Sequence, residues 1–148
     1  QEALNKTYRK MKGKPTIDFD KNADMWIGLW KKQFGITNLD APMSEKHKKE
    51  RSSRADTLCE MIRFCKERNL KPYIVLPPIH PALYSRLPMS FMKNYVYDFI
   101  SEAIGDELLV LDYLKDCNLY DNNCFQNSYF LNKKGALHLT KEILKRVM

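Results

Sequence analysis

Two short, continuously apolar runs constrain the fold of this chain more than any other feature of its sequence. They cover residues 73–76 (YIVL) and 108–111 (LLVL), and prolines follow the first while an aspartate follows the second. Strands that are apolar on both faces are typical of parallel sheets covered by helices. Because parallel strands need a long crossover connection, the segment between the runs should contain a helix.

Amphipathic patterns surround these runs. Between residues 91 and 104, apolar side chains recur at a helical period, namely Met92, Tyr95, Val96, Phe99, Ile100 and Ala103. Another such segment covers residues 54–68. A last one begins at about Lys133, with Ala136, Leu139, Thr140, Ile143 and Val147 facing inward. This order predicts an α/β fold, a parallel sheet with flanking helices. Two explanations for the few strands stay open: residues 16–19 (TIDF) form another strand, or the chain is the C-terminal part of a larger fold.

The pattern of the N-terminal third of the sequence predicts helices. Residues 2–12 are typical of a short charged helix or an arm. Asn22 is a suitable N-cap for a second helix, which Gly35 ends in a left-handed conformation. Within it Trp26, Trp30 and Phe34 repeat every four residues and so share one face. Because an interior glycine weakens a helix, close packing should explain Gly28.

The next helix is predicted to have a serine cap and buried cysteines. Ser52 and Ser53 are interpreted as the cap of the helix over residues 54–68. Cys59 and Cys65 on that helix are expected to be small buried hydrophobes. The four cysteines contain no C-x-x-C pair, so the sequence predicts neither a zinc ribbon nor a thiol redox centre. Whether Cys117 and Cys124 form a disulfide stays open.

Charge is concentrated at the N-terminal end. Residues 1–54 hold 13 Lys and Arg against 7 Asp and Glu, a net charge of +6, of the total of +7. Such a surface attracts an anionic polymer or an anionic membrane surface, although a solvated lysine-rich face is the alternative. Nucleic acid is disfavoured because no recognition motif accompanies the charge. We predict a single α/β domain over residues 1–148, with a basic helical lobe at 1–52 and a core at 53–148.

Polar residues follow both predicted strands. His80 and Tyr84 come after the first, and Asp112 and Asp116 come at the end of the second. Ligands of open α/β sheets bind beyond the carboxyl ends of the strands, so these residues should face a pocket. No G-x-S-x-G elbow, Gly-rich phosphate loop or H-E-x-x-H motif is found. No metal or cofactor is therefore predicted.

Two stretches resemble a known superfamily. Residues 125–136 (FQNSYFLNKKGA) are similar to the last block of SGNH-type hydrolases and O-acyltransferases, in which an aspartate and a histidine precede the final helix. Residues 73–84 (YIVLPPIHPALY) resemble the strand and loop of the D-alanyl transfer proteins of lipoteichoic acid synthesis. The resemblance covers roughly residues 50–148. It implies a flavodoxin-like sheet that carries acyl transfer by serine, histidine and aspartate.

The sequence departs from that pattern at its catalytic positions. Asn127 stands at the aspartate position, Phe130 stands at the histidine position, and no serine block is recognisable. His80 is a candidate replacement base, with Asp112 or Asp116 as the orienting carboxylate. If His80 does not replace the base, we expect the former catalytic site to persist as a pocket. Its predicted lining is His80, Tyr84, Asn127, Tyr129 and Asn132.

Two functions follow from the resemblance. The first is a cell-envelope acyl-transfer protein similar to the D-alanyl transfer proteins that act on teichoic acid, with a degenerate catalytic site. It implies a membrane-associated protein at the extracytoplasmic face of the cell membrane, with a membrane-bound acyltransferase as partner. The second is a non-enzymatic binding module on the same scaffold. Whether the chain is an enzyme stays open at this point.

Overall fold

The computed structural model of the chain describes residues 17–104, 108–116, 119 and 121–148. Its helices are α2 (Phe19–Phe34), α3 (Glu45–Lys66), α4 (Pro81–Tyr84), α5 (Met89–Met92), the π-helical turn η1 (Lys93–Tyr97), α6 (Asp98–Ile104), the 3-10 turn η3 (Asn122–Cys124) and α7 (Lys133–Val147). The strands are β1 (Ile74–Leu76) and β2 (Val110–Asp112). The predicted helix over residues 2–12 lies outside the described residues.

The strands pair as the apolar runs predicted. β1 and β2 are parallel neighbours, with Ile74 opposite Val110 and Leu76 opposite Asp112. Each is shorter than its apolar run, and β1 is only half-buried, because in a two-stranded sheet every strand is an edge. The α/β prediction is therefore confirmed at the coarse level of a small parallel sheet flanked by helices.

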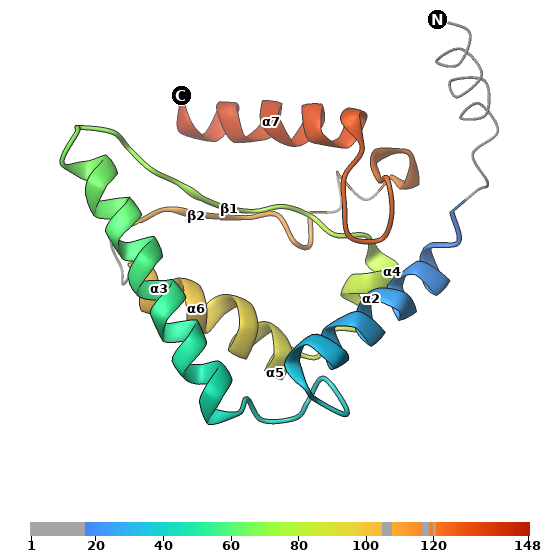
Figure 1. Cartoon of the computed structure of the whole chain (residues 1–148). Helices are drawn as coiled ribbons and strands as arrows, with labels where there is room; N and C mark the ends of the chain where they lie inside the picture. Colours follow the sequence, from blue (N-terminus) through green and yellow to red (C-terminus); the bar gives the residue numbers. More distant parts are fainter. Residues whose placement is uncertain (1–16, 105–107, 117–118, 120) are drawn as a thin grey trace, which may run out of the picture.

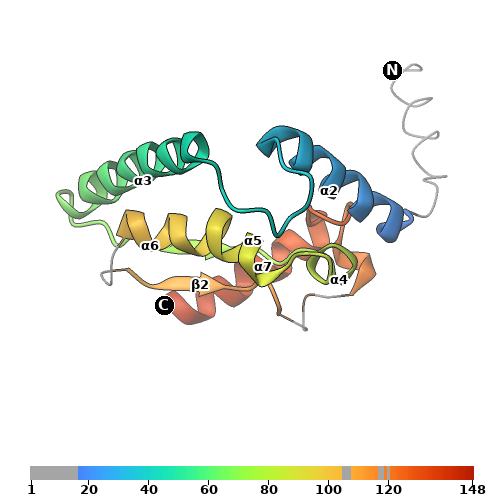
Figure 2. The same cartoon turned by 90° about the horizontal axis from the view of Figure 1, so that it is seen from below.

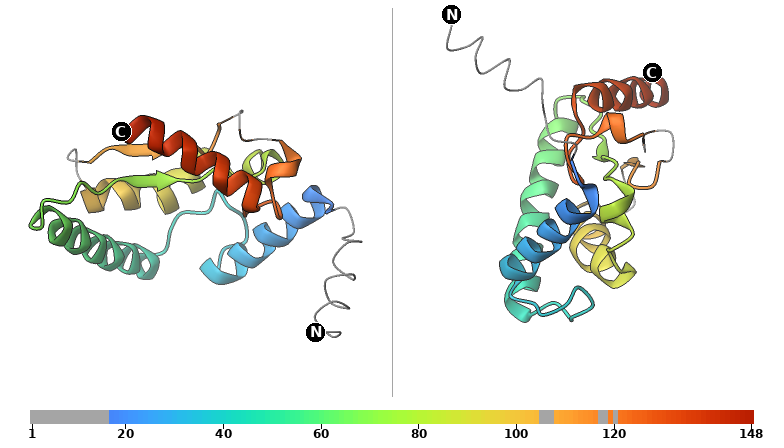
Figure 3. Two further views of the ribbon diagram at one scale, coloured as in Figure 1. Left: turned by 90° about the horizontal axis from the view of Figure 1, so that it is seen from above. Right: turned by 90° about the vertical axis from the view of Figure 1, so that its right-hand side faces the viewer.

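The helices form layers on the two faces of this sheet. Figure 1 shows α7 along one face, with α5 and α6 on the other. Viewed from below, α3 runs alongside α6 (Figure 2), and these two helices pack against each other. The side view in Figure 3 shows the same order of layers, with α2 beside α4. The crossover between the strands is thus helical, as expected.

The start of α2 differs from the prediction. Asp18, not Asn22, is its N-cap, and the Asp18 carboxylate accepts the Lys21 N–H. Phe19 opens the helix, so the proposed strand over residues 16–19 is wrong. The capping of a helix by an aspartate outweighs the strand tendency of such a short apolar segment. Gly35 ends α2 at a φ of 60°, as predicted.

Gly28 is not explained by packing. A Cβ built at this position would meet no atom within 4 Å. The interpretation of a close approach at Gly28 is therefore wrong, and nothing in the structure explains the glycine there.

The α3 helix begins a full two turns before the predicted start. Ser44 is its N-cap, and the Ser44 hydroxyl accepts the His47 N–H. Ser52 and Ser53 lie inside the helix, so their interpretation as caps is wrong, and the boundary set at residues 52 and 53 falls within α3. Cys59 is exposed rather than buried, because α3 packs on α6 through one face only.

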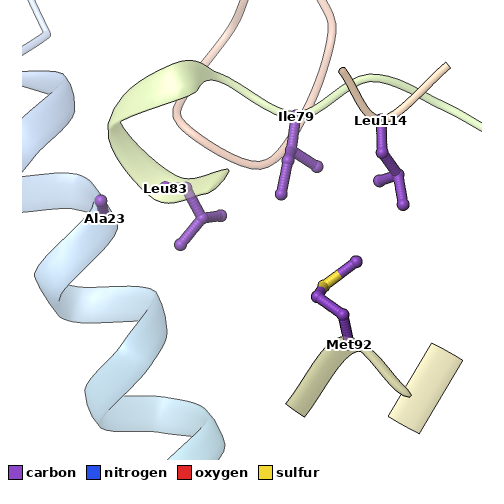
Figure 4. Packing of buried hydrophobic residues seen from close by; sticks show 5 residues of the cluster. All are labelled: Ala23, Ile79, Leu83, Met92 and Leu114. Atoms are coloured by element: carbon purple, nitrogen blue, oxygen red, sulfur yellow. The ribbon is translucent and has the colours of Figure 1, made fainter. Parts of the chain in front are cut away.

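Two apolar clusters stabilise the layers. On the side of α2 and α4, Figure 4 shows the buried side chains of Ala23, Ile79, Leu83, Met92 and Leu114 gathered between these elements and α5. On the other face of the sheet, Leu111, Tyr113 and Leu119 pack with Leu139 of α7.

The buried face of α7 is narrower than predicted. Ala136 and Thr140 were expected to face inward, yet both are exposed. Ile143 and Val147 do pack against the cluster around Leu139. The physical reason is the width of the sheet, since two strands cover only a narrow strip of a helix. None of the helices in the described ranges is long and apolar enough to cross a membrane.

Candidate functional site

An apolar groove lies where the two strands end. Its volume is about 320 Å³, within the range of roughly 300–1,000 Å³ that is common for small-molecule sites. Leu76, Pro77 and Ile79 line it from the end of β1, and Leu114 lines it just after β2. Because ligands of open α/β sheets bind at this edge, the groove is the candidate functional site.

Aromatic rings from two distant segments form one wall of this groove. Trp30 and Phe34 come from α2, and Tyr129 and Phe130 come from the turn before α7. The ring centroids of Trp30 and Tyr129 are 5.5 Å apart, and the ring of Trp26 lies 4.9 Å from that of Tyr129 and 5.8 Å from that of Phe130. The aromatic face predicted for this helix thus packs on the turn and borders the groove.

A buried polar contact holds that turn against α2. Ser128 is fully buried, and both its N–H and its hydroxyl donate to Asn22 Oδ1, at 2.9 and 2.6 Å. The Ser128 carbonyl in turn accepts the His80 N–H at 3.0 Å. Asn22 therefore joins α2 to the turn and to the loop after β1, and so fixes the aromatic wall in place.

Ion pairs hold the same helix against the segment that follows α4. The Arg86 guanidinium lies 2.8 Å from Asp20 and 3.0 Å from Asp24, both on α2. These carboxylates raise the pKa of Arg86 further above its ordinary value. The pair is partly exposed, so its contribution is orientation more than stability.

His80, the candidate base, is buried and has both ring nitrogens engaged. Its Nδ1 accepts the Ala82 N–H at 3.1 Å and caps α4, so the ring proton is on Nε2, which donates to Asn122 Oδ1 at 2.8 Å. The ring stacks on Phe19 with centroids 3.9 Å apart and meets the edge of Phe125. This geometry favours a structural role for His80 over proton transfer.

Asp112, the candidate orienting carboxylate, accepts hydrogen bonds from groups other than His80. Its two oxygens accept the Tyr97 hydroxyl at 3.2 Å and the Leu114 N–H at 2.9 Å. Burial, with the neighbouring Asp112 carboxylate, raises the pKa of Tyr97 to about 12. Asp112 therefore fixes the turn that carries Leu114 into the groove. Asp116 lies further along the same loop, where its N–H donates to the Tyr113 carbonyl.

Asn127 and Tyr84 also have local structural roles. The Asn127 side chain accepts the N–H groups of Tyr129 and Phe130, at 2.9 and 2.8 Å, and so shapes the aromatic turn. Tyr84 packs against the cluster of Figure 4, with the Lys115 ammonium 5.6 Å from its ring centroid. Of the predicted pocket residues, Tyr129 is the one that lines the groove.

Asn132 is the N-cap of α7. Its Oδ1 accepts the N–H groups of Lys134 and Gly135, and its Nδ2 donates to the carbonyls of Asn123 and Phe125. With every polar atom engaged in this way, Asn132 ties η3 to the start of the last helix. It does not point to a ligand.

The described residues contain no ready metal centre. In residues 17–104, 108–116, 119 and 121–148, no three His, Cys, Asp or Glu side chains gather as metal ligands would. Cys124 is buried with a free thiol, and Cys117 lies outside the described residues. The sequence left a disulfide between Cys117 and Cys124 open, and it stays open because Cys117 is not described.

Comparison with protein families, with curated proteins and with solved structures finds no significant match for this chain. The resemblance to SGNH-type proteins therefore rests on the two quoted stretches alone.

Several residues that build the site were not anticipated. Leu76 ends β1 and Leu114 follows β2, and both line the groove. Leu114 is an apolar residue in a polar-looking loop, which is a usable sign of a lined groove. Ser128 and Asn22 gave no such sign, because their contact joins residues far apart in the chain.

Proposed function

We propose that this chain is a non-enzymatic binding domain whose strand-end groove holds an apolar chain. The observation that carries this proposal is the lining of the groove, which is aromatic and aliphatic where an acyl-transfer enzyme needs a base. Phe130, at the position that the resemblance gives to the histidine, lines the groove. An aromatic ring there adds apolar surface and has no site for a proton.

The surrounding polar groups support binding over catalysis. Acyl transfer by a serine needs a base in contact with the nucleophile and a carboxylate that orients the base. His80 bonds to Asn122 and Ala82, and Asp112 bonds to Tyr97 and Leu114. Ser128 is fully buried and donates to Asn22. These contacts leave each group in a structural role.

We further propose that the scaffold is of the flavodoxin-like SGNH type and that the domain serves a cell-envelope acyl-transfer system. The support is the resemblance in residues 73–84 and 125–136, together with the parallel strand pair. In this setting the domain would lie at the extracytoplasmic face of the membrane, beside a membrane-bound acyltransferase. An anionic polymer such as teichoic acid, or the membrane surface, would meet residues 1–54.

The charge of that region is mostly outside the described residues. Residues 17–54 carry 8 Lys and Arg against 6 Asp and Glu, a net charge of +2, of the +6 found in residues 1–54. Lys46 and Lys48 are near Glu50 and Glu45 on the same helix, at 3.9 and 2.7 Å. Polyanion binding is therefore a proposal that depends chiefly on residues 1–16.

Binding to the groove should be visible in tryptophan fluorescence. The chain has two tryptophans, of which Trp30 lines the groove and Trp26 packs behind it. Titration with decanol, below its solubility limit, should give a saturable shift in emission as the alkyl chain replaces water beside Trp30. Val96→Phe, which fills the groove from η1, should weaken decanol binding about tenfold through overpacking.

Leu137→Phe is the matched control for this titration, since Leu137 is exposed on α7 and does not line the groove. It should bind decanol as the unmodified chain does. If Val96→Phe folds normally by circular dichroism and still binds with unchanged affinity, the groove is not the binding site.

A further inference from the structure

A second, more polar pocket adjoins the apolar groove. It has a volume of about 280 Å³ and lies between the end of α2, the first half of α3 and the segment η1–α6. Phe34 and Tyr95 line both cavities. The second pocket differs from the first in that acidic and basic side chains contribute to its lining, namely His47, Glu50, Arg51 and Arg54. The two cavities therefore share a wall, and together they offer an apolar surface and a more polar one.

The positive charge available in this pocket comes from Arg54. Arg51 is already paired, with Asp98 at 3.4 Å and with Glu102, and it also donates to a backbone carbonyl of η1. Glu50 lies 3.9 Å from a lysine one turn earlier. Arg54 forms no ion pair with any residue in the described part of the chain. The Arg54 guanidinium is therefore available to an anion in the pocket, where Glu50 is the carboxylate that lines the same pocket.

Tyr95 stands between the two cavities with an unused hydroxyl. This hydroxyl is buried and has no hydrogen-bond partner among the described residues. Burial raises the pKa of Tyr95, so the hydroxyl stays protonated and can donate. Buried polar groups are nearly always paired, and an orphan among them points to a water, an ion or a ligand that completes it. Tyr95 is also on η1, and π-helical turns occur frequently at functional sites.

We infer that the site binds a single-chain amphiphile with an anionic headgroup, its alkyl chain in the apolar groove and its headgroup between Tyr95 and Arg54. This inference rests on the proposed function and adds the class of ligand. A carboxylate and a phosphate share the required chemistry, because each accepts hydrogen bonds from a phenol and a guanidinium. A neutral alcohol of the same chain length has the tail without the charge.

The test compares decanol, decanoate and decyl phosphate by calorimetry on the full chain, at one ionic strength and below their micelle concentrations. The unmodified chain should bind the two anions about tenfold more tightly than decanol, as one charge-assisted contact allows. Arg54→Gln should lower the affinity for both anions about fivefold and leave decanol unchanged. Tyr95→Phe should act in the same direction. The tighter of the two anions identifies a carboxylate or a phosphate as the natural headgroup.

Arg63→Gln, on the same helix but outside the pocket, is the matched control and should change none of the three affinities. Equal affinity for decanol and both anions would overturn the headgroup inference and leave the apolar groove standing. If Arg54→Gln changed the three affinities no more than Arg63→Gln does, the headgroup inference would be overturned as well. If none of the three compounds binds, the proposed function fails together with the inference.

Discussion

Replacing Gly135 with alanine is expected to destabilise the chain by about 3 kcal/mol, the upper part of the usual range for overpacking. A Cβ built at Gly135 would lie 2.2 Å from the Cys124 carbonyl oxygen and 2.9 Å from a methyl of Leu131. The first of these neighbours is backbone and cannot rotate away. The start of α7 would therefore have to move off η3 and strain the Asn132 cap. Urea denaturation followed by circular dichroism measures the change in unfolding free energy.

Gly28→Ala is the matched control for this experiment. Gly28 is also helical, and an added Cβ there meets nothing within 4 Å. Alanine should therefore stabilise the chain by about 0.5–1 kcal/mol, through its higher helix propensity. If Gly135→Ala were as stable as the unmodified chain, the close approach of α7 to η3 would be wrong.

Asn22→Ala is expected to lower the unfolding free energy by about 2–4 kcal/mol, a loss of similar size. It would leave the buried Ser128 N–H and hydroxyl without their shared acceptor, and an unsatisfied buried donor costs about 1–3 kcal/mol. Ser128→Ala should cost less, about 1 kcal/mol, because the hydroxyl is removed together with its need for a partner. The same urea denaturation measures both variants.

Asn22→Asp distinguishes this contact from a general effect of changing α2. An aspartate carboxylate can accept both donors of Ser128, and a negative charge near the start of a helix is favourable. Its unfolding free energy at neutral pH should therefore stay within about 1 kcal/mol of the unmodified chain. A loss as large as that of Asn22→Ala would show that the oxygen of Asn22 is not what holds the turn.

The strand pair and its covering helices could be predicted from local pattern alone. Residues 73–76 and 108–111 are apolar on both faces, and the interval between them has a helical period, so a parallel pair with a helical crossover was the simplest arrangement. The ends of the helices were harder. Asp18 competed with Asn22, and Ser44 competed with Ser52 and Ser53, as residues of the same capping type. Local sequence does not decide among equivalent caps.

The candidate groove lies at the edge of the sheet where a pocket was expected, but most of its lining differs from the predicted set. His80, Asn127 and Asn132 are residue types that serve both in catalysis and in capping. Their local role became visible only through contacts such as His80 with Phe19 and Asn122. The groove is instead lined by apolar residues from separate segments, whose meeting depends on how α2 and the turn before α7 pack.

The central claim, that the strand-end groove binds without catalysing acyl transfer, is tested most directly by nitrophenolate release from p-nitrophenyl decanoate and p-nitrophenyl acetate. The expected rate with the unmodified chain is no higher than in buffer. The double variant Asn127→Asp and Phe130→His should be equally inactive, since no serine in the described part of the chain lines the groove beside the restored pair. Steady turnover by the unmodified chain, abolished in a folded His80→Ala variant, would contradict the claim and establish His80 as the base.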